Sequence, residues 1–102
     1  MARRRQAHYP LKTIKAAFTE ATRLNRTMTA ADGAEELGMD EQAVVVAGLT
    51  GRDFDKSMRS EVNPAIWQDV YKPTIDGREL YVKFTLDSQG ELLLISFKEN
   101  EL

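Results

Sequence analysis

The dipeptide Asp76-Gly77 lies between two runs of alternating apolar and polar residues, and it constrains the fold of this chain more than any other feature. An Asp-Gly pair in this context favours a two-residue type I′ turn, which joins two antiparallel strands and pairs Ile75 with Arg78. Opposed residues of an antiparallel pair point to the same face, so this pairing sorts the other residues of both strands. The pairs predicted on one face are Tyr71 with Val82, Asp69 with Phe84 and Trp67 with Leu86. The turn therefore predicts an apolar face that one carboxylate interrupts.

The other face of this hairpin is predicted to be polar and basic. The pairs on it are Gln68 with Thr85, Val70 with Lys83 and Lys72 with Tyr81. An even loop length in the next turn, at residues 87–90, extends this sorting to the last strand. The core then receives Leu93, Ile95 and Phe97, and the basic face receives Leu92, Leu94, Ser96 and Lys98. Lysines, a tyrosine, a serine and a glutamine thus form a local anion site, although a solvated outer face of an antiparallel sheet explains the same pattern.

The spacing of apolar residues divides the chain into two halves. After Gly51 the period is two, and six of the eight aromatic residues lie there, which predicts strands at residues 53–58, 66–72, 78–87 and 92–98. Before Gly51 the spacing is helical and predicts helices at residues 11–24, 29–37 and 41–49. Thr29 and Asp40 are the expected N-caps of the last two helices, and Gly38 is the expected C-cap between them.

The predicted fold class is α+β, a small antiparallel sheet with N-terminal helices packed on one face. We expect a single domain over residues 1–102. It consists of a basic N-terminal arm (1–10), a helical half (11–50) and an antiparallel sheet (51–98).

Charge is unevenly distributed along a chain whose net charge is only −2. Residues 1–26 carry a net charge of +6, residues 27–51 of −5 and the remainder of −3. The whole molecule is therefore not a polycation that binds any nucleic acid. The basic arm, with Arg3, Arg4 and Arg5, suits contact with RNA or with an acidic partner, and a frayed, solvated terminus explains it as well.

Several residue types are missing or rare, which excludes some kinds of chemistry. No cysteine is present, so disulfides and thiolate sites are excluded. No apolar run reaches the roughly 18 residues of a membrane helix, and no signal-peptide core follows the first residues. We therefore expect a cytoplasmic protein. His8 is the only histidine, and Asp53 with Asp55 alone is a weak metal pair, so no metal or cofactor is expected.

Two polar residues occupy positions where their strands are otherwise apolar. Lys56 lies between Phe54 and Met58, and Gln68 has apolar neighbours at the same spacing. Residues placed against the pattern of their strand are where functional sites are expected. An edge strand or a snorkelling side chain explains the same pattern without a function.

Three segments, residues 54–58, 66–73 and 95–99, resemble the MqsR (motility quorum-sensing regulator) toxin family. Residues 66–73, which read Ile-Trp-Gln-Asp-Val-Tyr-Lys-Pro, are the most specific of the three. The resemblance implies a RelE-like toxin fold and an mRNA interferase, an endoribonuclease that cleaves messenger RNA at short G-C-containing sites without the ribosome. It also implies a type II toxin-antitoxin system with a cognate antitoxin that is MqsA-like and of the DNA-binding helix-turn-helix type.

The resemblance assigns catalytic roles to Lys56, Gln68 and Tyr81, and it matches Lys98 to a further functional lysine. Lys72 occupies a position where related sequences carry arginine. A compact ammonium group therefore replaces a guanidinium that can donate two parallel hydrogen bonds. The affinity for phosphate or the preferred cleavage site is therefore expected to differ from that of the related sequences.

The chemistry expected of these residues is attack of a ribose 2′-hydroxyl on the adjacent phosphorus, which leaves a 2′,3′-cyclic phosphate and a 5′-hydroxyl. Lys72, Lys83 and Lys98 are expected to hold RNA phosphates. Neighbouring cations are expected to lower the pKa of both lysine and tyrosine side chains. The choice between Lys56 and Tyr81 as the base stays open.

Two other classes of function fit the same residues. A module that grips RNA without cutting it would use the same basic face. A small adaptor would recruit another protein through the edge of the sheet. Trp67 and Tyr71 are candidates for base stacking, but the predicted register sends both into the core.

Overall fold

The computed structural model describes residues 3–4, 6–19, 25–38 and 42–100. The helices are α1 (Leu11–Thr19), α2 (Met28–Leu37) and α3 (Gln42–Ala47), followed by the 3-10 turn η1 (Gly51–Asp53). The strands are β1 (Arg3–Arg4), β2 (Phe54–Arg59), β3 (Trp67–Tyr71), β4 (Thr74–Ile75), β5 (Arg78–Leu86) and β6 (Leu92–Glu99). Three helices combine with an antiparallel sheet, so the predicted α+β class is confirmed.

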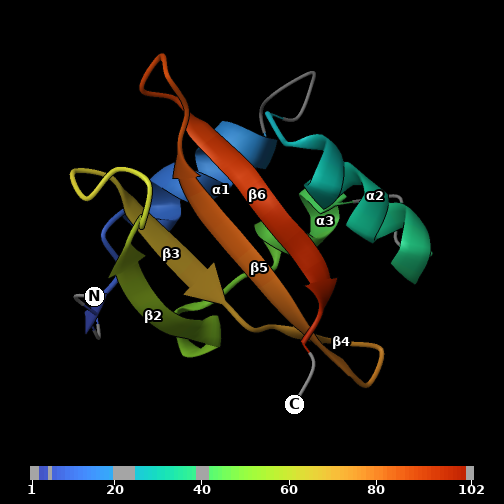
Figure 1. The fold of residues 1–102 in the computed structure, drawn as a ribbon. Coiled ribbons are helices and arrows are strands. Elements are labelled where there is room, and N and C mark those ends of the chain that lie inside the picture. The colour runs from blue at the N-terminus through green and yellow to red at the C-terminus, as the bar shows by residue number, and fades with distance from the viewer. Residues whose placement is uncertain (1–2, 5, 20–24, 39–41, 101–102) are drawn as a thin grey trace.

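The strands pair in the order β1-β2-β3-β5, with β6 on the other side of β5 and the short β4 paired with the start of β5. Helices α1 and α3 lie behind the sheet in the view of Figure 1, and α2 lies alongside β6. No described helix crosses the face turned toward the viewer. Within the described part of the chain, none of the helices has the length and apolar character to span a membrane.

The hairpin at Asp76-Gly77 forms as predicted. Asp76 has a φ of 53° and Gly77 a φ of 79°, the positive values that a type I′ turn requires at both positions. The pairs observed are Ile75 with Arg78, Tyr71 with Val82, Val70 with Lys83 and Asp69 with Phe84. The predicted register of this hairpin is therefore confirmed.

One hydrophobic core lies between the sheet and the helices. Its fully buried rings include Phe18 of α1, Tyr71 of β3 and Phe84 of β5. The ring centre of Phe84 lies 5.3 Å from that of Phe18 and 6.0 Å from that of Tyr71, distances at which aromatic pairs attract. Trp67 belongs to the same core. The prediction that Trp67 and Tyr71 pack in the core is confirmed.

One helix cap differs from the prediction. Helix α2 begins after Thr27, whose side chain accepts a hydrogen bond from the amide three residues on, and not after Thr29. The backbone N–H of Thr27 donates to the carbonyl oxygen of Leu94 at 3.0 Å, which holds the segment before the helix against β6. Gly38 ends α2 with a φ of 67°, as predicted. Asp40 and the predicted end of the first helix lie outside the described residues.

A bulge changes the sorting of residues along β6. Lys83 pairs with Ser96, but the next residue of β5, Phe84, pairs with Leu94. Ile95 is therefore an extra residue without a partner, and the alternation shifts by one position there.

The bulge corrects the predicted faces of four residues of β6. Leu92, predicted on the basic face, pairs with Leu86 and packs against the core. Leu94 is fully buried in the core, although the alternation placed it on the basic face. Leu93 and Ile95, predicted to be buried, are only partly buried. Phe97, beyond the bulge, is buried as predicted.

Candidate active site

A second bulge sets the direction of Lys56. Phe54 pairs with Tyr71 and Lys56 pairs with Val70, so Asp55 is an extra residue between the two pairs. Phe54 packs against the core, and the bulge turns Lys56 to the opposite face. This face, which carries Lys56, Val70 and their partners on β5 and β6, is the one that no described helix covers (Figure 1). We call it the open face.

One row of paired residues crosses the open face. Lys56 lies opposite Val70, Val70 lies opposite Lys83, and Lys83 lies opposite Ser96. Val70 is fully buried, although it is not part of the hydrophobic core on the other side. Lysine stems cover apolar surface in this way while their ammonium groups reach water. The buried Val70 therefore has one lysine on each side, Lys56 and Lys83.

Tyr81 lies in the next row, between two lysines. It pairs with Lys98, whose Nζ lies 5.5 Å from the centre of the Tyr81 ring. Lys83 Nζ lies 5.8 Å from the same ring centre. Both distances fall within the range of about 6 Å at which a cation is attracted to an aromatic face. The structure thus brings Tyr81, Lys83 and Lys98 together.

Asp55 adds a carboxylate that the sequence pattern did not place on this face. Its Oδ2 lies 3.5 Å from Lys72 Nζ. Burial, and secondly the charge of Asp55, raise the pKa of Tyr81 above its ordinary value. The prediction that neighbouring lysines lower the pKa of this tyrosine is therefore wrong, and the phenol keeps its proton at neutral pH. The only feature of the sequence that points to Asp55 on this face is the broken alternation around Lys56.

The pKa of Lys83 is shifted downward, as predicted. Burial lowers the pKa of Lys83, and the positive charges of Lys98 and Lys56 lower it further. Both causes disfavour the ammonium form. At a given pH, Lys83 is therefore a neutral amine more often than a solvated lysine.

Gln68 lies on the open face in a different row. It pairs with Met58 and is two positions along β3 from Val70. This makes Gln68 a diagonal neighbour of Lys83. The row of Lys83 separates Gln68 from Tyr81.

Asp53 and Asp55, the weak metal pair of the sequence, have separate contacts. Asp53 Oδ2 accepts hydrogen bonds from the backbone N–H of Thr50 at 2.8 Å and from its hydroxyl at 3.2 Å, which closes η1. Asp55 contacts Lys72 on the open face. Each carboxylate thus has a partner of its own.

On the core side, Asp69 is the carboxylate that interrupts the apolar face. It is fully buried, and its two oxygens accept hydrogen bonds from the backbone N–H groups of His8 at 3.0 Å and Tyr9 at 2.8 Å. The Tyr9 hydroxyl donates to the carbonyl oxygen of Trp67 at 2.6 Å, and His8 stacks on the Trp67 ring. Asp69 therefore fixes the segment before α1 to the sheet, and His8 lies away from the lysines.

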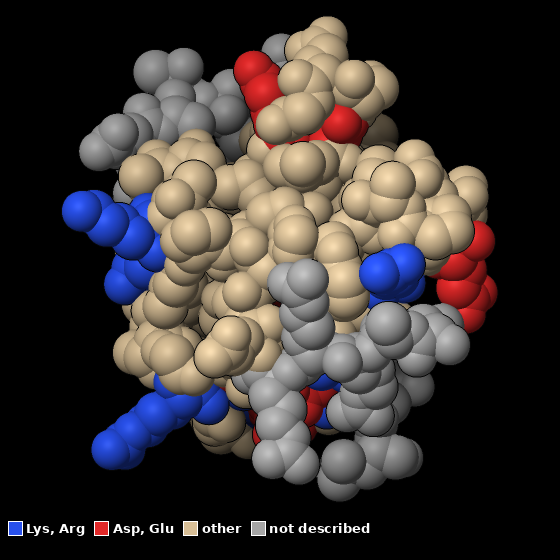
Figure 2. Space-filling view, turned by 90° about the vertical axis from the view of Figure 1, so that its left-hand side faces the viewer, with Lys and Arg blue, Asp and Glu red and all other residues tan. Residues whose placement is uncertain are grey.

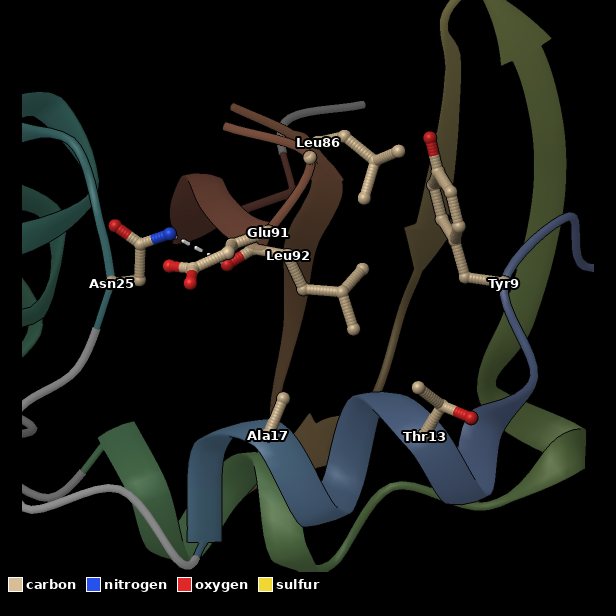
Figure 3. A pocket seen from close by; sticks show the side chains of 8 residues that line it. Tyr9, Thr13, Ala17, Asn25, Leu86, Glu91 and Leu92 are labelled. Atoms are coloured by element: carbon tan, nitrogen blue, oxygen red, sulfur yellow. Dashed lines mark hydrogen bonds between the residues drawn. The ribbon is translucent and has the colours of Figure 1, made fainter. Parts of the chain in front are cut away.

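A cavity of about 480 Å³ lies on the core side, between α1 and the far end of the β5–β6 hairpin (Figure 3). Leu86 and Leu92 reach toward it from the strands, and Ala17 from the helix. Asn25 Nδ2, on its border, donates to the carbonyl oxygen of Leu92 at 2.8 Å. The predicted site residues do not line this cavity. It therefore adds nothing to the candidate site.

Positive charge is not continuous on the side of the molecule that Figure 2 shows. On the side of the molecule shown in Figure 2, the described Lys and Arg side chains lie apart from one another around a broad uncharged surface. The cluster of lysines on the open face belongs to a chain with a net charge of −2.

Known proteins are similar to this chain over almost its whole length. The family described as "Motility quorum-sensing regulator, toxin of MqsA" matches residues 6–99. The mRNA interferase toxin MqsR of Escherichia coli (strain K12) is 36% identical over 98 residues, which cover 94% of this chain and 97% of that protein. The matched region contains strands β2 to β6, which build the open face. The chain belongs to the MqsR toxin family.

Proposed function

We propose that this chain is a toxin endoribonuclease that cleaves messenger RNA on the open face of its sheet. The observation that carries the proposal is the gathering of Lys83 and Lys98 around Tyr81, with Lys56 in the neighbouring row. Such a cluster neutralises phosphate charge and offers a phenol proton beside it. Membership of the family and the name of the Escherichia coli relative support the same activity.

The reaction uses a nucleophile that RNA itself carries, the ribose 2′-hydroxyl. Cleavage requires removal of its proton, in-line placement against phosphorus, stabilisation of the phosphoryl oxygens and protonation of the leaving 5′-oxygen. Amine, amide and phenol side chains can perform each of these tasks. The products are a 2′,3′-cyclic phosphate and a 5′-hydroxyl.

We assign the chemistry to three residues of the open face. Tyr81, with its raised pKa, is a proton donor to the leaving oxygen and not the base. Lys56 stabilises the developing negative charge, and Gln68 orients the phosphate or the hydroxyl through its amide. The remaining lysines supply charge that holds RNA phosphates, and they are Lys72, Lys83 and Lys98.

The proposed function includes a protein partner. The family description names these proteins as toxins of MqsA. We accordingly propose a cognate, MqsA-like antitoxin of the DNA-binding helix-turn-helix type, together with a preference for short G-C-containing sites and a place in the cytoplasm.

The first test is incubation of the purified protein with unstructured RNA in excess EDTA. We expect fragments that end in 2′,3′-cyclic phosphate and 5′-hydroxyl groups, at the same rate with and without EDTA. Loss of cutting in EDTA contradicts the mechanism. RNA that binds but stays intact after overnight incubation favours the binding module over the enzyme.

The second test uses Lys56→Ala and Tyr81→Phe. Tyr81→Phe is expected to lower the cleavage rate by roughly 10²–10⁴-fold, because the acid is lost. Lys56→Ala is expected to lower it by roughly 10²–10³-fold, because charge stabilisation in the transition state is lost. Thermal unfolding should stay close to that of the wild type, because both side chains lie outside the core. Lys12→Ala, at an exposed position of α1, is the control. Unchanged cutting by both variants refutes the assignment.

A further inference from the structure

We propose that Lys83 is the general base of this reaction, the group that takes the proton from the ribose 2′-hydroxyl. The proposal rests on the proposed function and identifies a residue for the task that Tyr81 does not perform. Its basis is the position of Lys83 at the centre of the open face, beside the proton donor.

Lys83 lies on a strand that has a neighbour on each side. Its strand, β5, pairs with β3 on one side and with β6 on the other. It lies opposite fully buried Val70 and is itself partly buried. Lys98, by contrast, is exposed on the outer strand, and Lys72 is paired with Asp55 at 3.5 Å. Of these three lysines, Lys83 is the partly buried one without a carboxylate partner among the described residues.

Lys83 also lies close to the proposed acid. Its Nζ is 5.8 Å from the centre of the Tyr81 ring, and both side chains project from the same strand to the same face. The amine and the phenol therefore lie on one face, where a single bound phosphodiester can contact both. Gln68, a diagonal neighbour, lies on the other side of Lys83 along the sheet.

Charged and titratable groups surround Lys83 on each neighbouring element of the open face. They are Asp55 and Lys56 on β2, Lys72 directly after β3, Tyr81 on β5 and Lys98 on β6. Burial and the charges of Lys98 and Lys56 lower the pKa of Lys83. A useful fraction of neutral amine is what a lysine needs to act as a base near neutral pH. Lys83 therefore acts as the base in place of the phosphate-holding role given to it above, and Lys72 and the exposed Lys98 hold the phosphates.

The step balances without any further reactant. The Nζ lone pair of Lys83 takes the proton of the 2′-hydroxyl while O2′ forms a bond to phosphorus. The bond between phosphorus and O5′ breaks, and O5′ leaves with the phenol proton of Tyr81. Lys83 finishes as an ammonium and Tyr81 as a phenolate. Proton exchange with water restores both groups.

The main test is Lys83→Arg in the full chain. Arginine keeps the positive charge but does not give up its proton at any usable pH. Single-turnover cleavage of an unstructured RNA is measured from acid to alkaline pH, and binding is measured with a 2′-O-methyl RNA that lacks the nucleophile. We expect binding close to that of the wild type, a cleavage rate lower by roughly 10²–10⁴-fold and loss of the rise in rate with pH.

A second variant is needed because the larger arginine side chain of Lys83→Arg could lower the cleavage rate by disturbing the site. Lys83→Ala should cut poorly and regain cleavage when ethylamine is added, in proportion to the amine concentration. Lys12→Arg and Lys12→Ala, on the exposed side of α1, are matched controls without an effect of pH or amine. Thermal unfolding of every variant verifies that it is folded.

The outcomes separate this proposal from the function on which it rests. A wild-type protein that does not cut RNA refutes the proposed function. A wild type that cuts, with Lys83→Arg cutting at nearly the same rate and pH profile, overturns the assignment of the base alone. Failure of ethylamine to restore cutting by folded Lys83→Ala overturns it as well.

Discussion

Lys98 Nζ lies 5.5 Å from the centre of the Tyr81 ring, and the two residues are partners in the ladder between β5 and β6. The exposed side chain of Lys98 therefore extends the positive charge of the open face to its outer strand, where RNA can arrive.

Lys98→Ala is expected to weaken the binding of a 2′-O-methyl RNA. Loss of one phosphate contact to a single strand reduces the slope of log affinity against log salt by about 0.7. Binding isotherms at several salt concentrations measure this slope, with Lys12→Ala as the control. An unchanged slope means that Lys98 does not contact phosphate.

Asp69→Ala is expected to destabilise the fold by about 2–4 kcal/mol, because two backbone N–H groups lose a charged acceptor. The bonds concerned are those from His8 at 3.0 Å and Tyr9 at 2.8 Å. Urea unfolding measures the change, and Glu61→Ala, at an exposed loop position, should stay within about 0.5 kcal/mol of the wild type. Equal stability of both variants contradicts the role of Asp69 as an anchor.

Gly33→Ala tests the close approach of α2 to β6. A Cβ at Gly33 would lie 1.7 Å from the backbone oxygen of Phe97, so the helix must move. We expect a loss of about 1–3 kcal/mol in unfolding free energy. Gly51→Ala is the matched control, because no atom lies within 4 Å of its Cβ position. A Gly33→Ala protein as stable as this control shows that the packing adjusts.

Lys83→Met is expected to unfold at a higher temperature than the wild type at neutral pH. The lowered pKa of Lys83 means that the folded protein binds fewer protons than the unfolded chain, between that lowered value and the ordinary 10.5. The penalty is full below the lowered pKa and disappears as the pH rises toward 10.5. The advantage of Lys83→Met should therefore shrink in alkaline solution. Thermal melts across this range that show a constant difference contradict the linkage.

Asp55→Asn removes the carboxylate that the bulge in β2 brings to the open face. The pKa of Tyr81 should fall but stay above its ordinary value, because burial is the larger cause of the shift. Ultraviolet titration, compared with Tyr81→Phe, measures it. RNA affinity should rise about two- to fivefold, since one exposed ion pair is worth about 0.2–1 kcal/mol. Weaker RNA binding by Asp55→Asn contradicts this account of the site.

The bulges mark the limit of prediction from alternation. The pattern around Asp76-Gly77 sorted β3 and β5 correctly, because a short turn sets the register without help from the rest of the chain. It missorted Leu94, because an extra residue at Ile95 shifts the faces. Lys56 looked misplaced for the same reason, since Asp55 is extra in its strand.

The face that carries the candidate residues was predictable, and the electrostatics of that face were not. Lys83 and Tyr81 are two positions apart on one strand, so their shared face follows from local geometry. The raised pKa of Tyr81 depends on burial and on Asp55, which reaches the open face only through a bulge in a different strand.

The sequence by itself determined the α+β class, the Asp76-Gly77 hairpin and the face on which most of the lysines gather, because periodicity and turn chemistry are properties of neighbouring residues. Tertiary structure decided where the strands bulge, what the buried carboxylate of Asp69 holds and which titratable groups are shifted. These depend on contacts between segments far apart in the chain, such as Asp69 with His8, and only the folded arrangement brings such segments together.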